Sequence, residues 1–274
     1  MNAHALQSTA ARMPEIARMP GHWLLARLGK CVLRPGGVEL TGRMLAALNI
    51  TPQDDVVEFA PGLGLTARAV LARNPRTYTA VEQDPKAAER IRQWLPKKAK
   101  CLNGTAERTG LPSACASAVY GEAMLSMQTP EQKRRIVQEA FRLLRPGGRY
   151  AIHELCTVPD DLPAALLKEM ERRMSLSIHV GVRLLTAPAW RALLEECGFT
   201  VEWEACAPMH LLEPRRVLRD EGIRRTLKIV FNMIRDSEAR ARVREMRGIF
   251  RSFGDHLSAI SLVARKPQAG AQPA

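Results

Sequence analysis

Short apolar runs alternate with helical patterns along most of the chain. Runs rich in apolar residues and bounded by turn formers predict strands at residues 56–59, 78–82, 99–102, 116–120, 149–154 and 200–205. Between them, apolar residues recur at helical spacing, which predicts helices at 65–73, 85–94 and 130–144 and another from residue 190. Two more helices, at 22–32 and 39–48, precede the first strand. This alternation predicts an α/β fold with a doubly wound, mostly parallel sheet.

Helix boundaries are marked by specific residues. Thr129 is a suitable N-cap, Pro130 would take the first helical position, and Gln132 completes a capping box. Pro85 opens the preceding helix in the same way. The Pro-Gly-Gly sequence at 146–148 is expected to end the helix before the fifth strand.

A basic helical stretch lies between the sixth strand and an alternating segment at 258–266, which predicts a seventh strand. Residues 215–251 hold twelve Lys or Arg and five acids, and this net of +7 is about half of the +13 of the whole chain. Two apolar stripes at helical spacing run through it: Ile223, Leu227, Val230, Phe231 and Ile234, then Val243, Met246, Phe250 and Phe253. We expect a helical hairpin, capped at Asp236 or Ser237, that lies over the ligand edge of the sheet with its basic face outward. That face is either solvated surface or a site for an anionic partner, namely nucleic acid, an acidic substrate or a membrane surface.

Length and composition favour one decorated domain. The 274 residues are 46% hydrophobic, which is ample for a core. We assign residues 1–50 to a tail with lid helices, 51–266 to the main domain with 206–255 as a helical insertion, and 267–274 to a disordered tail. Residues 1–20 are polar and Ala-rich and are expected to form a frayed terminus. They lack the apolar block of a signal peptide. No run is long enough to cross a bilayer.

The cysteines and histidines point away from disulfides and metals. Six cysteines are widely spaced, with no Cys-x-x-Cys pair and no clustered His. We therefore expect small buried thiols in a reducing cytoplasm and no metal site.

The segment at 56–67 carries the clearest chemical signal. A buried strand runs into a tight turn at Gly62 and Gly64, and the helix that follows offers free backbone N–H groups to an anion. This is a nucleotide-like site at the first strand of an open sheet. Gly62-x-Gly64-x-x-Ala67, with Glu82 downstream, also fits a dinucleotide fingerprint. Glu58 favours a cationic ligand instead, because its carboxylate would repel a pyrophosphate and hold an ammonium or sulfonium group.

Together, residues 58–64 resemble the first motif of the class I S-adenosylmethionine-dependent methyltransferases. The resemblance runs from about Val56 to Lys266 and includes the strand ending at Glu82, the Asn-Gly-Thr-Ala-Glu segment at 103–107 with Leu111-Pro112, and the turn at 143–150. Thr105 stands where the family usually has an acid. The resemblance implies a seven-stranded sheet whose last strand, at 258–266, runs antiparallel between the fifth and sixth strands. The layout is most similar to the small-molecule branch, including quinone-biosynthesis enzymes. It implies that the cofactor S-adenosylmethionine contacts Glu58, Ala60, Pro61, Gly62, Gly64, Glu82, Gln83, Thr105, Ala106 and Glu107.

Three residues are candidates for catalysis or acceptor contact. Glu122 and His153 end the fourth and fifth strands, the positions nearest the transferring methyl group, and His can accept a proton near neutral pH. His179 lies in a segment that lines the acceptor pocket of related small-molecule enzymes. The resemblance thus implies in-line methyl transfer to a small, apolar or amphipathic acceptor. Nucleic-acid methylation through the basic insertion and NAD(P)-dependent oxidoreduction remain as alternatives, although no Asn/Asp-Pro-Pro-Tyr/Phe motif or added nucleic-acid module is visible.

Overall fold

Seven strands form one sheet in the computed structural model, which describes residues 13–268. They are β1 (Asp55–Phe59), β2 (Thr77–Glu82), β3 (Ala99–Asn103), β4 (Ala116–Glu122), β5 (Leu144–Thr157), β6 (Thr200–Pro208) and β7 (Leu257–Arg265). Their order is β3-β2-β1-β4-β5-β7-β6, and β7 alone runs antiparallel to its neighbours β5 and β6. The predicted mixed sheet with an antiparallel last strand is therefore confirmed. The strand order reverses between β1 and β4, where sheets of this kind bind ligands.

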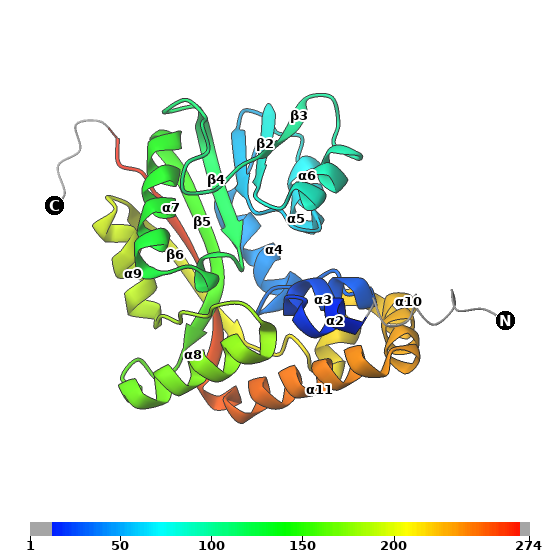
Figure 1. Ribbon diagram of the computed structural model, residues 1–274. Helices are drawn as coiled ribbons and strands as arrows, with labels where there is room; N and C mark the ends of the chain where they lie inside the picture. Colours follow the sequence, from blue (N-terminus) through cyan, green and yellow to red (C-terminus); the bar gives the residue numbers. More distant parts are fainter. Residues whose placement is uncertain (1–12, 269–274) are drawn as a thin grey trace.

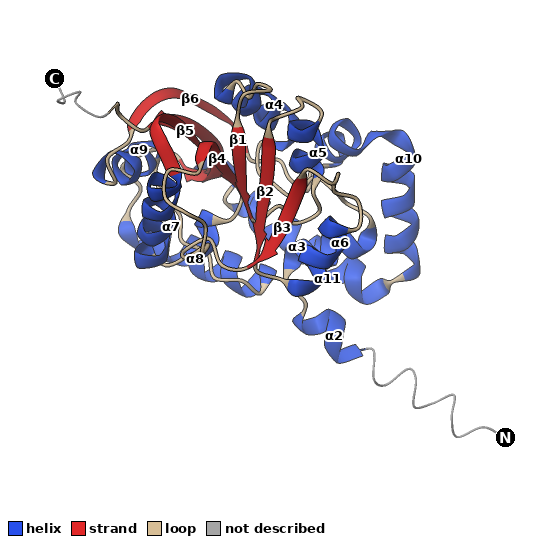
Figure 2. Ribbon diagram, turned by 90° about the horizontal axis from the view of Figure 1, so that it is seen from above, coloured by secondary structure: helices blue, strands red, loops and turns tan. Residues whose placement is uncertain are grey.

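Helices cover both faces of the sheet (Figure 2). On one face lie α4 (Gly37–Leu48), α5 (Leu65–Leu71) and α6 (Pro85–Arg92), packed on Val56 and Ala118. On the other lie α7 (Pro130–Leu143) and α9 (Ala187–Glu196), packed on Val57 and Val119. Successive strand residues point to opposite faces, so strands buried on both faces read as continuous apolar runs.

A helical cap lies beyond the carboxyl ends of the parallel strands (Figure 1). It consists of α2 (Met13–Arg18), α3 (Gly21–Leu28), α8 (Ala164–Ile178), α10 (Pro214–Arg235) and α11 (Ser237–Ser252). Short 3₁₀ turns at Leu125–Met127 and Gly254–His256 follow β4 and precede β7. The cap has its own core, in which Leu24 and Leu28 of α3 pack with Val243 and Met246 of α11. The predicted second stripe is thus buried as expected.

Local capping signals are confirmed where they were clearest. The Thr129 side chain accepts from the Gln132 backbone N–H, and the reciprocal bond from the Thr129 N–H to Gln132 completes the box. Pro85 opens α6 after Asp84, whose carboxylate accepts from two backbone N–H groups. Asp236 caps α11 by accepting from the Ala239 N–H at 2.9 Å.

Some predicted boundaries were wrong. β5 begins at Leu144, because Leu144 already pairs with Ala116 of β4 and the Pro-Gly-Gly segment forms an irregularity within the strand. It extends to Thr157, because β7 pairs with it up to that residue. Residues 13–18 form α2 rather than a frayed end, and Ile16 is buried in the cap. The expectations for residues 1–12 and 269–274 fall outside the described residues. The six cysteines are free, and within residues 13–268 no helix is long and apolar enough to cross a membrane.

The expected helices α10 and α11 are present, but α10 exposes the first apolar stripe instead of turning only basic residues outward. On α10, Ile223, Leu227 and Phe231 have exposed fractions of 69%, 64% and 55%. The opposite side of this helix packs on α3 instead: Ile229 is buried and the Asn232 side chain donates to the Leu28 carbonyl at 2.9 Å. The basic face of α11 also has an exception, since Arg242 is buried and donates to the carbonyls of Ile16 and Met19.

Candidate functional site

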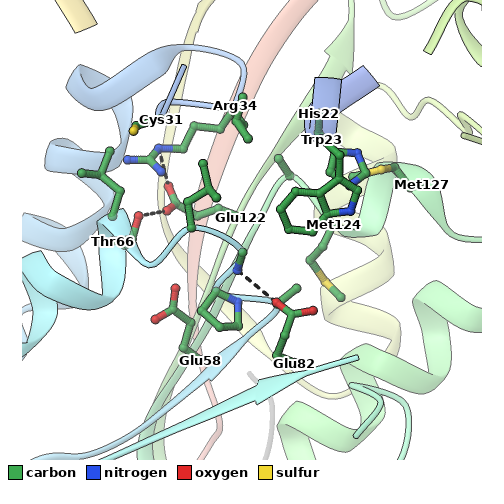
Figure 3. Close-up of a pocket in the computed structure, with 17 residues that line it drawn as sticks. His22, Trp23, Cys31, Arg34, Glu58, Thr66, Glu82, Glu122, Met124 and Met127 are labelled. Carbon is green, nitrogen blue, oxygen red and sulfur yellow. Dashed lines mark hydrogen bonds and ion pairs between the residues drawn. The ribbon is translucent and has the colours of Figure 1, made fainter. Parts of the chain in front are cut away.

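A cavity of about 170 Å³ opens at the carboxyl ends of β1 and β4, beneath α3. In Figure 3, His22, Trp23, Met124 and Met127 lie on one side of it, and Cys31, Arg34, Thr66 and Glu122 on the other. Glu58, Glu82 and the Pro61–Gly62 turn complete its wall. Of the residues predicted to contact the cofactor, Glu58, Ala60, Pro61, Gly62 and Glu82 line this cavity.

The turns after β1 and β4 hold unusual backbone conformations. Ala60 and Ala123, which directly follow the two strands, have φ of 51° and 52°. Gly62 and Gly64 have φ of 54° and 72°. A Cβ on Gly64 would press on the Trp94 ring and lie 2.7 Å from Ile91 Cδ1, so this position requires glycine both for conformation and for space. Strained residues of this kind tend to gather where a backbone is shaped around a ligand.

Glu82 ties this turn to the end of β2. Its Oε2 accepts the Gly62 backbone N–H at 3.0 Å and its Oε1 accepts the Asp84 N–H at 3.0 Å. A carboxylate has about four acceptor positions, so it can still accept from a ligand hydroxyl in the cavity.

Glu58 is a buried acid at the floor of the cavity. The phenols of Tyr78 and Tyr120 both donate to its Oε2, the latter at 2.5 Å. Burial raises the pKa of Glu58 to about 7, although the two phenols favour the carboxylate. The side chain is therefore poised to ionise when a positive charge arrives beside it.

Glu122 is a second buried acid, and it is held in its charged form. It accepts from Thr41 at 2.5 Å and from Thr66, and it lies 3.4 Å from the Arg34 Nε. Burial opposes its ionisation, but Arg34 and His153 outweigh burial and lower the pKa of Glu122 to about 2.

His153 lies behind Glu122, outside the cavity lining. Its ring is fully buried, with Nδ1 2.8 Å from Glu122 Oε1 and Nε2 2.5 Å from the Pro35 carbonyl oxygen. Each ring nitrogen thus faces a hydrogen-bond acceptor. The predicted pair is thus brought together, but only Glu122 reaches the cavity.

Helix α3 forms the cover over the cavity. Trp23 and His22 are in contact, with ring centroids 5.1 Å apart, and the Arg90 guanidinium lies 5.0 Å from the Trp23 ring centroid. Burial lowers the pKa of His22, against the attraction of Asp84. At neutral pH the imidazole is therefore uncharged and able to accept a proton.

A smaller apolar cavity of about 90 Å³ adjoins the first one. The two share four lining residues: His22, Leu33, Ala123 and Met127. Its remaining wall is mostly aliphatic, thioether and aromatic, and is supplied by α3, α8, α11 and the segment after β6: Leu25, Met174, Ile178, Met209, Leu211, Met246 and Phe250.

Glu154 shapes the loop between the two cavities. Its carboxylate accepts the backbone N–H groups of Met124, Leu125 and Ser126 at 2.9, 2.7 and 3.0 Å. Burial raises the pKa of Glu154, and these three bonds oppose that shift. These bonds hold Met124 at the wall of the larger cavity and Ser126 at the wall of the smaller one.

The other predicted site residues lie outside both linings. Glu107 is engaged by Arg135 at 2.7 Å and by Gln132 at 3.0 Å. Gln83, Thr105 and Ala106 lie in the segments after β2 and β3. Gly64 does not line the cavity but packs against Trp94 and Ile91. His179 is the C-cap of α8, with φ 55°. The structure therefore brings the β1, β2 and β4 residues together but not the segment at 103–107.

Sequence reasoning missed Arg34 and Thr66 in the lining. Arg34 is buried, and its Nε has no hydrogen-bond partner despite its ion pair with Glu122. The Leu-Arg-Pro-Gly-Gly sequence at 33–37 was interpreted only as a helix-ending turn. Thr66, at the start of α5, could have been predicted from the sequence, because a hydroxyl beside a glycine turn can hydrogen-bond to a ligand or a carboxylate.

The family described as "Methyltransferase domain" matches residues 57–152. An uncharacterized protein of Haemophilus influenzae is 31% identical over 240 residues, covering 86% of this chain and 92% of that protein. The 27-O-demethylrifamycin SV methyltransferase of Amycolatopsis mediterranei is 26% identical over 242 residues, covering 86% of this chain and 85% of that enzyme.

Among solved structures, a putative sarcosine dimethylglycine methyltransferase from Galdieria sulphuraria has the same fold. It superposes with a TM-score of 0.62 at 17% identity, covering 84% of each chain. At this identity the likeness concerns the fold alone.

Proposed function

Because the chain belongs to the class I S-adenosylmethionine-dependent methyltransferases, we propose that it methylates a small, apolar or amphipathic acceptor by in-line displacement. S-adenosylmethionine is the methyl donor and supplies an electrophilic methyl group when bound. The observation that carries the proposal is the shared wall between the two cavities, because it places an apolar site directly beside the polar one.

The residues of the larger cavity fit the donor in three ways. Glu82 faces it with free acceptor positions for ribose hydroxyls. Glu58 and Glu122 supply negative charge for the ammonium and sulfonium groups. Arg34 lines the cavity, and its guanidinium suits the carboxylate of the methionyl end. The positive-φ turns at Ala60 and Ala123 bring backbone to the same place.

In this arrangement the protein positions two reactants and excludes water. Trp23 and His22 cover the donor side, and the apolar wall receives the acceptor. His22 belongs to both linings, so we assign it as the group that contacts the nucleophile and takes its proton where the nucleophile is protonated. His153 orients Glu122 through the 2.8 Å contact and acts as a positioning residue. His179 has no role in this scheme.

A single-turnover assay with methyl-labelled S-adenosylmethionine tests the proposal. The acceptor panel should contain quinone-type phenols, amphipathic amines and carboxylates, and RNA. Methyl transfer to RNA but to none of the small acceptors would refute the proposal and support the nucleic-acid alternative.

Replacing His22 tests its assigned role. We expect His22→Gln to lower kcat about 10²–10⁴-fold, as for loss of a general base, with S-adenosylhomocysteine affinity nearly retained. In the wild type, kcat should fall as pH drops below the usual histidine range, because burial lowers the His22 pKa. The matched control is His179→Gln, which should retain activity. Equal activity in the two variants would remove His22 from the mechanism.

A further inference from the structure

Helix α10 carries most of the large hydrophobic side chains that are exposed among the described residues. Of the nine large hydrophobic side chains that are exposed, six lie on this helix, and the other three are scattered on other elements. The six and their exposed fractions are Leu218 (45%), Ile223 (69%), Leu227 (64%), Val230 (46%), Phe231 (55%) and Ile234 (66%). Contiguous exposed patches of this kind mark interaction sites, whereas single exposed apolar residues need no explanation.

Five of these residues form one continuous stripe. Gly222, at φ 73° and ψ 167°, interrupts the helix, and residues 223–235 then run for about 20 Å. Ile223, Leu227, Val230, Phe231 and Ile234 follow helical spacing along one side. The opposite side carries the buried Ile229 and the Asn232 contact to α3. The helix is therefore anchored without the stripe, which no other described element covers.

The rim of the stripe is cationic. Arg224, Lys228 and Arg235 are exposed and each directly follows a stripe residue, which places them along one edge of it. The two acids of α10 do not offset this charge at the surface. Asp220 is paired with Arg216, and Glu221 is buried against Lys30.

We propose that α10 docks on the surface of an anionic lipid bilayer, with its axis parallel to the membrane plane. The stripe would enter the boundary between headgroups and acyl chains, while the three cations reach lipid phosphates. A nucleic acid would use the cations but leave the stripe in water. A second copy would bring two like-charged rims together without acids to pair them.

The start of the same helix borders a groove that shares residues with the apolar cavity. An open groove beside the start of α10 is lined by Arg215, Arg219 and three residues that also line the apolar cavity: Met209, Leu211 and Phe250. If the proposed function holds, an apolar acceptor can pass from the bilayer through this groove to the donor. The docking itself does not depend on that function.

Vesicle cosedimentation of the full chain tests the docking. We expect binding to vesicles of phosphatidylglycerol with phosphatidylcholine to be at least tenfold stronger than to phosphatidylcholine alone, and to weaken with salt. The double variant Leu227→Glu/Phe231→Glu should lose at least tenfold. Its matched control is Leu176→Glu, which alters an exposed leucine of α8 (62% exposed) and should bind normally.

The charge contribution has its own pair of variants. Arg224→Gln/Lys228→Gln should reduce binding to anionic vesicles, whereas Lys97→Gln/Lys100→Gln, which removes two exposed lysines elsewhere, should not. Thermal unfolding and S-adenosylhomocysteine binding should be the same in all variants, which separates this test from that of methyl transfer.

Four results would overturn the proposal. They are no vesicle binding, equal binding to neutral and anionic vesicles, binding that the α10 variants leave unchanged, and a solution dimer that Leu227→Glu/Phe231→Glu dissociates in the absence of lipid. RNA binding that depends on Arg224 and Lys228, without vesicle binding, would assign the rim to nucleic acid instead.

Discussion

The buried acid Glu58 should couple donor binding to pH. In the free protein its pKa is about 7, because burial favours the neutral acid. An ammonium or sulfonium group beside it favours the carboxylate, so binding of the donor should lower this pKa and release a proton. The sign follows directly: affinity should rise as pH increases through 7.

The magnitude follows from the two pKa values. If the ligand returns Glu58 from about 7 to its ordinary 4.5, the coupling approaches about 3 kcal/mol. Between pH 6 and pH 8 the affinity should then increase about tenfold, with roughly half a proton released per ligand at pH 7.

Isothermal titration calorimetry checks both numbers. S-adenosylmethionine and S-adenosylhomocysteine should be titrated at pH 6, 7 and 8 in buffers of different ionisation enthalpy, which reports the protons released. The matched control is Glu58→Gln, which keeps the size and the acceptor oxygen for Tyr78 and Tyr120. Because the ligand's own amino group also titrates, the difference between the two proteins is the measurement. If wild type and Glu58→Gln show the same pH slope, the assignment of Glu58 to the cationic end of the donor is refuted.

Three other changes give distinct results. Glu82→Ala should weaken S-adenosylhomocysteine binding by about 1.5–3 kcal/mol in calorimetry, through loss of a charge-assisted hydrogen bond; unchanged affinity would place the ribose elsewhere. Gly64→Ala should lower the free energy of unfolding by about 1–3 kcal/mol, because of its positive φ and the clash with Ile91. Gly42→Ala, where a Cβ meets nothing within 4 Å, should not lower it, and equal denaturant midpoints would contradict the argument. In assays without lipid, Phe250→Ala should raise the acceptor KM with little effect on S-adenosylhomocysteine affinity, whereas Phe231→Ala should leave acceptor kinetics unaltered. The reverse order would show that α10, not α11, roofs the apolar cavity.

Features that depend on neighbouring residues in the chain were predicted well. The Thr129 capping box, the Asp236 cap and the glycine turn at 62–64 are specified within a few residues, and each is found in the structure. The glycine spacing alone left a dinucleotide open. Glu58 favoured S-adenosylmethionine, and the comparisons agree.

The site was predicted only as far as strand ends locate it. Glu58, Glu82 and Glu122 follow from their positions on parallel strands, whose carboxyl ends meet at one edge. The positions of His22 and Arg34 do not follow from strand ends, because His22 lies on α3 and Arg34 in the loop after it. Their arrival beside β4 depends on how the cap folds over the sheet. His153 was predicted to lie near the methyl group, but its two ring nitrogens are in hydrogen-bond contact with Glu122 and the Pro35 carbonyl.

The sequence by itself determined the order of strands and helices, the ends of several helices and the positions of the acids that line the larger cavity, since these depend on short-range periodicity and turn chemistry. Tertiary structure decided which apolar faces are buried. Helical spacing identifies a stripe on α10 and another on α11, and the two look equivalent in the sequence. Only the packing of Ile229 against α3 turns the α10 stripe outward, while Met246 and Phe250 meet α3, α8 and the apolar cavity. A periodic pattern defines a face, but burial requires that another element reach it.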